Sequence, residues 1–176
     1  MSDRKNAAKT AAFFGVMLCL SLILSYIESA LSFSSAVPFI KPGFSNIPVV
    51  ITLYLSGFWG AFVLGIAKSV LSLLFLGRLG SLFYSLCGII FAVAGMGIAK
   101  KSDIFSLLGV NAAGSAAHIA GQMLAAVLML SDTDVLRLFP YLILFSLISG
   151  AVTYFPELAV LKFLNTHKNI GTGTKI

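Results

Sequence analysis

The chain has 176 residues, of which 59% are hydrophobic and only 10% are charged, and its formal net charge is +6. Soluble domains carry about 25% charged residues, and a chain this short cannot bury so much apolar surface in one aqueous core. This composition excludes a soluble enzyme, a disordered protein and a disulfide scaffold, and it indicates an integral membrane protein.

The positive charge is interpreted as a topology signal. Basic residues lie beside apolar stretches, as in the cytoplasmic loops of membrane proteins, and they form no stripe with interleaved aromatic residues. We therefore expect a lipid bilayer around the chain and no nucleic-acid partner. Cys19 and Cys87 lie within apolar stretches at no metal-binding or disulfide spacing, so they are interpreted as small hydrophobic residues.

The first apolar stretch predicts a membrane helix over about residues 8–31. Arg4, Lys5 and Lys9 precede it, as in a signal peptide, but the stretch is longer than the roughly 7–15 apolar residues of a cleaved signal. We therefore expect an uncleaved helix.

The N-terminal part of this helix carries small residues at a spacing of four. The two rows are Ala7, Ala11 and Gly15 and, beside them, Ala8 and Ala12. Small residues at this spacing let helices approach closely. The rows predict either a docking face for a partner subunit or a contact within the bundle.

The stretch 42–76 is too long for one ordinary membrane helix, which needs about 20 residues. A turn at Gly57-Phe58-Trp59-Gly60 would divide it into a short helix, about 46–56, and a second helix, about 60–76. This division leaves eight Lys and Arg residues on the cytoplasmic side and three outside, whereas a single helix leaves five and six. The positive-inside rule favours the division.

The later apolar stretches predict helices over about residues 80–99, 105–130 and 138–164. The predicted fold is an all-α membrane protein with one domain, residues 1–176. It is a six-helix transmembrane bundle with a short second helix and both termini in the cytoplasm.

Lys68 lies inside the predicted third helix and Glu28 near the end of the first. Ionisable groups in a membrane helix are costly, so each is a functional candidate. Either the two residues form a structural ion pair, or Lys68 presents its positive charge to a ligand. Lys41 and Arg78, in the expected outer loops, would complete a basic mouth that favours an anionic substrate.

The helix predicted over 105–130 carries Asn111, Ser115, His118 and Gln122 at positions i, i+4, i+7 and i+11, which share one face. This polar stripe is either a wall of a ligand site or interhelical hydrogen-bonding glue. The same helix has small residues at Ala113, Ala117 and Gly121, which predict packing inside the bundle.

Several kinds of chemistry are not expected. His118 has no second metal ligand at a suitable spacing, and the chain has no nucleophile elbow, Walker A loop or acidic diphosphate–Mg²⁺ motif. We expect no metal, no cofactor and no catalytic residue. Glu157, beside Pro156 in the last helix, is interpreted as an interfacial residue paired with a cytoplasmic lysine.

Two segments carry a family resemblance. One is Phe39-Ile40-Lys41-Pro42-Gly43-Phe44-Ser45-Asn46-Ile47, after a helix that ends Ser25-Tyr26-Ile27-Glu28-Ser29, and the other is Ala117-His118-Ile119-Ala120-Gly121-Gln122. They resemble the Gx transporter family, also called heptaprenyl diphosphate synthase component I, which has a basic residue where Lys68 lies. Ile119 departs from the Asn of the family's Ala-His-Asn-x-Gly-Gln pattern.

That family is similar to the substrate-binding S components of energy-coupling factor (ECF) transporters. Those proteins bind a vitamin or related small molecule near the outer face of the cytoplasmic membrane and work with a membrane T component and two ATPases. The resemblance implies a vitamin-like, flavin or isoprenoid-related ligand, and it implies that the small-residue rows of the first helix dock the T component. The residues expected to contact the ligand are Lys41, Asn46, Lys68, Asn111, His118 and Gln122.

Two alternatives stay open. The chain could be a non-transporting accessory subunit of polyprenyl diphosphate or menaquinone synthesis, or of a flavin or quinone electron-transfer assembly, with the polar stripe used only for packing. An ion-coupled carrier that uses Glu28 and Lys68 is less favoured, because no internal repeat is visible. The name of the family suggests a synthase, but the chain shows no residues for prenyl transfer, so we do not expect an enzyme.

Overall fold

The computed structural model describes residues 2–32, 43–76, 79–131 and 133–167, and these residues form helices with no strand among them. The elements in chain order are α1 (Ser2–Ser32), η1 (Phe44–Asn46), α2 (Ile47–Leu76), α3 (Leu79–Lys101), α4 (Leu107–Leu130), η2 (Asp134–Leu138) and α5 (Phe139–His167).

Five helical segments are long and apolar enough to cross a membrane. They are Asn6–Ala30, Phe44–Phe75, Leu82–Lys101, Leu107–Leu130 and Asp134–Leu164. The expectation of an all-α, multi-pass membrane protein is therefore confirmed.

The part of the chain that the structure describes has five long helices rather than the six expected, because the stretch from Ile47 to Leu76 forms the single element α2. Its helical backbone is interrupted at Gly57, where φ is 80° and ψ is −175°. This conformation is essentially restricted to glycine. The division expected at Gly57–Gly60 is thus a sharp kink inside α2 and not a loop between two separate helices.

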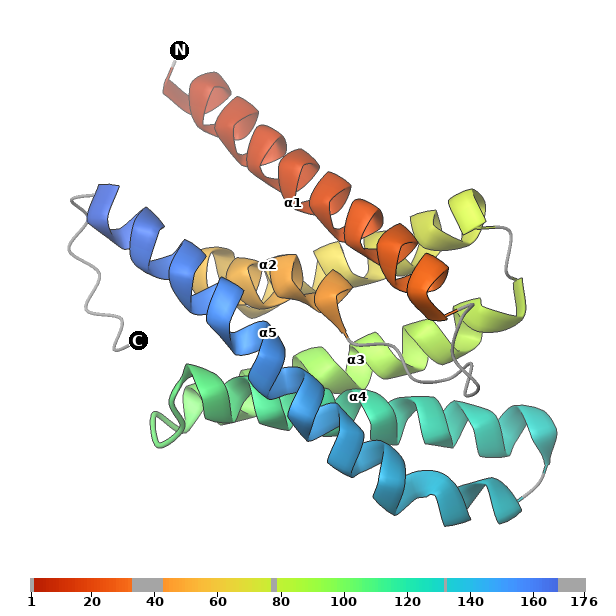
Figure 1. The fold of residues 1–176 in the computed structure, drawn as a ribbon. Coiled ribbons are helices and arrows are strands. Elements are labelled where there is room, and N and C mark those ends of the chain that lie inside the picture. The colour runs from red at the N-terminus through yellow and green to blue at the C-terminus, as the bar shows by residue number, and fades with distance from the viewer. Residues whose placement is uncertain (1, 33–42, 77–78, 132, 168–176) are drawn as a thin grey trace.

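The chain reverses its direction at this kink. Lys68 Nζ donates a hydrogen bond of 2.6 Å to Asn46 Oδ1, although the two residues would be about 33 Å apart along a straight α-helix. A Cβ atom on Gly60 would lie 3.5 Å from Thr52 Cγ2, so the two arms of α2 also touch close to the kink. Figure 1 shows the first arm in orange and the returning arm in yellow.

The first arm, residues 47–56, forms the centre of the hydrophobic core. Val49, Val50 and Leu53 are almost completely buried. Ten helical residues span only about 15 Å, roughly half of the hydrocarbon thickness of a bilayer. The arm is therefore too short to cross a membrane by itself and is held in place by its neighbours.

One of these neighbours is Lys100 in the last turn of α3. Its Nζ atom donates a hydrogen bond of 2.7 Å to Leu53 O and lies 4.5 Å from the centre of the Tyr54 ring. The last carbonyl groups of a helix lack intrahelical donors and favour a cation nearby. Lys100 therefore stabilises the end of the short arm.

Helices α3 and α4 pack closely through small residues. A Cβ atom on Gly95 would lie 2.8 Å from Ala117 Cβ, and one on Gly121 would lie 2.5 Å from Cys87 O. Only glycine permits these approaches without displacing the neighbouring helix. The prediction that the small residues of α4 pack inside the bundle is confirmed.

The helix ends are arranged at two opposite ends of the bundle. Helix α1 begins and α5 ends on the left of Figure 1, where α3 is also connected to α4. At the opposite end, α1 ends and α5 begins. The N-terminal half of α1 extends beyond the other helices, and its residues are mostly exposed.

Candidate functional site

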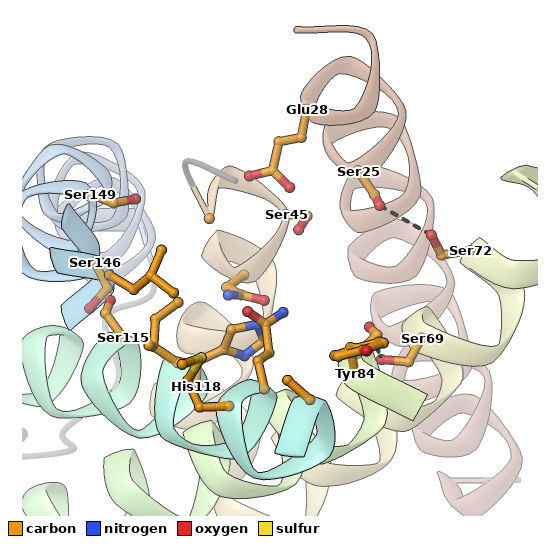
Figure 2. A pocket seen from close by; sticks show the side chains of 18 of the residues that line it. Ser25, Glu28, Ser45, Ser69, Ser72, Tyr84, Ser115, His118, Ser146 and Ser149 are labelled. Carbon is orange, nitrogen blue, oxygen red and sulfur yellow. Dashed lines mark hydrogen bonds between the residues drawn. The ribbon is translucent and has the colours of Figure 1, made fainter. Parts of the chain in front are cut away.

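A cavity of about 480 Å³ lies between the five long helices, at the end of the bundle where α1 ends and α5 begins. Its volume falls within the range of about 300–1,000 Å³ that is usual for small-molecule sites. Polar side chains from several helices line part of it (Figure 2). Its apolar part consists of leucines, Phe145, Ile119, Met123, Ala126 and Val135.

Four of the six residues predicted to contact a ligand line this cavity: Asn46, Lys68, His118 and Gln122. They come from η1, the second arm of α2, and α4. Lys41 and Arg78 lie outside the described residues, so the predicted basic mouth stays a prediction. Asn111 is described but does not belong to the lining.

Lys68 is buried, with 6% of its surface exposed, and it binds η1. Its Nζ atom donates to Ser45 O at 3.1 Å, to Ser45 Oγ at 3.0 Å and to Asn46 Oδ1 at 2.6 Å. An ammonium group has three N–H donors. These three bonds can use all of them, so Lys68 fixes the segment that forms one wall of the cavity.

Glu28 also faces the cavity, from the last turns of α1, and it is almost completely buried (Figure 2). Its predicted pairing with Lys68 stays a prediction. The hydrogen bonds described for Lys68 connect it to η1. The cavity thus brings together the two ionisable groups, Glu28 and Lys68, that the sequence analysis identified as functional candidates in membrane helices.

The polar stripe on α4 divides into two parts. Ser115, His118 and Gln122 line the cavity, whereas Asn111, one turn nearer the start of α4, is packed against α5. Asn111 Nδ2 donates to Gly150 O at 2.8 Å and to Thr153 Oγ1 at 3.0 Å. Asn111 therefore makes the interhelical hydrogen bonds, whereas Ser115, His118 and Gln122 form a cavity wall, so each of the two interpretations applies to a different part of the stripe.

Glu157 lies on α5 close to Asn111, and it is buried, with 1% of its surface exposed. Its expected place at a membrane interface, paired with a cytoplasmic lysine, stays a prediction. Among the described residues, no lysine lies within ion-pair distance of it.

Sequence reasoning missed most of the hydroxyl groups in the lining. The serines are Ser25, Ser45, Ser69, Ser72, Ser85, Ser115, Ser146 and Ser149. Ser25 and Ser72 are joined at 3.2 Å, and Ser85 donates to Ser69 at 3.0 Å.

A signal for some of these hydroxyl groups was present in the sequence. Ser69 and Ser72, and likewise Ser146 and Ser149, are three residues apart in apolar helices, a spacing that places each pair on one face.

A glycine on α3 positions the polar side chains of α4. A Cβ atom on Gly88 would lie 2.7 Å from His118 Cε1 and 3.0 Å from Gln122 Cγ. Real Cβ atoms essentially never show the first distance, and the second is unusually tight, so the imidazole occupies space that only glycine leaves open and the amide stem lies close beside it. Gly88 was not recognised from the sequence because it lies in an apolar run with several other glycines.

The residues predicted to dock a partner lie far from the cavity. Ala7, Ala8, Ala11, Ala12 and Gly15 are all exposed, and a Cβ atom on Gly15 would meet nothing within 4 Å. The rows therefore make no close contact with the described part of the bundle. This leaves the face open to lipid or to another membrane protein.

The described residues contain no group of three or more His, Cys, Asp or Glu side chains that could hold a metal ion. The family model for heptaprenyl diphosphate synthase component I matches residues 17–156, a span that includes every cavity-lining residue. No curated protein and no solved structure matches the chain.

Proposed function

We propose that this chain, which belongs to the heptaprenyl diphosphate synthase component I family, is the substrate-binding membrane subunit of an ECF-type importer. It captures a vitamin-like, flavin or isoprenoid-related small molecule in the cavity and hands it to partner subunits. The observation that carries this proposal is the cavity of about 480 Å³ inside a bundle of membrane helices.

The position of the cavity supports capture from one side of the membrane. The cavity lies at the end of the bundle opposite to Lys100, Lys101 and the start of α1. The positive-inside rule assigns the end with these basic residues to the cytoplasm. In this proposal the protein lies in the cytoplasmic membrane and its cavity faces outward.

The exposed small residues of α1 support a partner. A row of alanines with a glycine lets a second membrane helix approach its backbone closely. We assign this face to a membrane T component that is driven by two ATPases. The chain itself supplies no residues for nucleotide hydrolysis or prenyl transfer in this proposal.

A second candidate is a non-transporting accessory subunit of polyprenyl diphosphate synthesis. The description of the family as component I favours it, because it implies at least one further component. In that case the exposed face of α1 would recruit the other component, and the cavity would be empty or filled with lipid.

Mass spectrometry of small molecules released from the purified protein distinguishes these functions. Capture predicts a stoichiometric compound that is released from the wild type by denaturation and is missing from His118→Ala. An accessory role predicts only lipid and detergent in both proteins, together with co-purification of a soluble synthase component.

A further inference from the structure

Building on the proposed capture function, we infer that the cavity selects an uncharged molecule that carries several hydrogen-bonding groups on an apolar frame. Lys68 shapes this cavity instead of binding the ligand. This inference departs from the anionic substrate that the basic residues of the sequence suggested. Three observations carry it: the N–H donors of Lys68 already bind oxygen atoms of η1, the formal charges of the described lining residues cancel, and many hydroxyl groups line the cavity.

The first step concerns the ammonium group of Lys68. Its three N–H donors have three oxygen partners in η1, at 2.6 to 3.1 Å. An anionic ligand could receive a hydrogen bond from Lys68 only by displacing Ser45 or Asn46. That exchange would open the wall of the cavity, because η1 is held against the second arm of α2 by these bonds.

The second step concerns net charge. Among the described residues that line the cavity, Lys68 is the only lysine or arginine and Glu28 is the only acidic residue. Their formal charges cancel. A charged group that leaves water for a site inside a membrane bundle needs an opposite charge and several hydrogen bonds. A diphosphate would bring two or more negative charges, but the described lining residues include no lysine or arginine besides Lys68.

The third step concerns the hydroxyl groups. Eight serines and Tyr84 belong to the lining, and a hydroxyl group can either donate or accept a hydrogen bond. Figure 2 shows Ser115, Ser146 and Ser149 on one side and Ser69 with Tyr84 on the other. A ligand with hydrogen-bonding groups at both of its edges fits this arrangement, and the leucines and Phe145 contact its apolar frame.

The test measures the charge of the compound that the protein itself retains. The full chain is purified in detergent and denatured, and the released small molecules are passed over a mixed anion and cation exchanger at pH 8 before mass spectrometry. Ala126→Phe fills the cavity from α4, and Ala151→Phe adds the same bulk on an exposed face of α5. Gln122→Ala provides a second cavity variant if Ala126→Phe does not fold.

We expect wild type and Ala151→Phe to release one compound that passes the exchanger unretained and is reduced at least tenfold in the cavity variants. A phosphorylated or carboxylated compound with the same dependence on the cavity would overturn the inference and leave the capture function standing. Release of no compound that depends on the cavity would overturn the capture function, and this inference with it.

Discussion

Asn46 and Lys68 lie eleven residues before and eleven residues after Gly57, and their side chains are joined by a hydrogen bond of 2.6 Å. This symmetry about the kink means that the two arms of α2 return to the same level of the bundle. The turn and the bond therefore define one unit, a helical hairpin whose open end forms a wall of the cavity.

The kink predicts a strong requirement for glycine at position 57. Gly57→Ala should lower the free energy of unfolding by about 1–3 kcal/mol, because alanine must adopt φ near 80° with ψ near −175°. Unfolding in mixed micelles provides the measurement. Gly15→Ala is the matched control, since its backbone is helical and its Cβ would meet nothing within 4 Å. Equal stability of the two variants would contradict the assigned turn.

The bond between Asn46 and Lys68 predicts coupling between the two residues. Asn46→Leu should destabilise the protein by about 1–3 kcal/mol, because it removes an acceptor from a buried ammonium group. In a protein that already carries Lys68→Met, the Asn46→Leu substitution should be less harmful, because no buried ammonium group is left without its acceptor. The double variant should therefore lose less stability than the sum of the two single losses, by about 0.5–3 kcal/mol. Additive losses would show that the bond does not hold η1 in place.

The membrane class, the approximate helix positions and the reversal region followed from hydropathy, charge and paired glycines. The hydrogen bond from Lys100 to Leu53 could not be predicted, because it joins residues 47 positions apart and depends on how α3 packs against the short arm. The hydrogen bonds of Lys68 could not be predicted either. Its position inside an apolar stretch marked it as functional, but only the folded hairpin shows that it donates to Ser45 and Asn46.

Only one wall of the cavity could be predicted from the sequence, because contacts between helices are not visible in it. The helical spacing of the α4 residues identified one wall, since periodicity within one helix is local information. The serines of α1, α2, α3 and α5 come together only through packing between helices, and single serines in apolar helices are common. The role of Gly88 likewise depends on which residue of α4 lies opposite.

Gly88 leads to a prediction about ligand retention. Gly88→Ala should cost about 1–3 kcal/mol through overpacking, and it should displace His118 into the cavity, because the new Cβ would lie 2.7 Å from Cε1. The amount of compound released per mole of purified protein should fall well below that of Gly15→Ala. A folded Gly88→Ala protein with full ligand content would show that the position of His118 has no influence on binding.

Asn111 should behave differently from the other residues of its stripe. Asn111→Ala removes both hydrogen bonds to α5 and leaves Gly150 O and Thr153 Oγ1 without this donor. Thermal unfolding should reveal a loss of about 1–3 kcal/mol. The ligand content of the folded fraction should match the wild type, because Asn111 is not part of the lining. Loss of ligand without loss of stability would return Asn111 to the binding site.

The exposed rows of α1 lead to the last prediction, which concerns assembly rather than binding. Gly15→Leu introduces a branched side chain on the face formed by Ala7, Ala11 and Gly15, where close approach of a second helix depends on small residues. Co-purification with a membrane partner should be abolished, while the melting temperature and ligand content should stay unchanged because nothing in the bundle lies near this Cβ. Ala151→Leu, on an exposed face of α5, adds comparable bulk and should leave assembly intact. If both variants retain the partner equally, the docking face lies elsewhere, and the exposed half of α1 contacts only lipid.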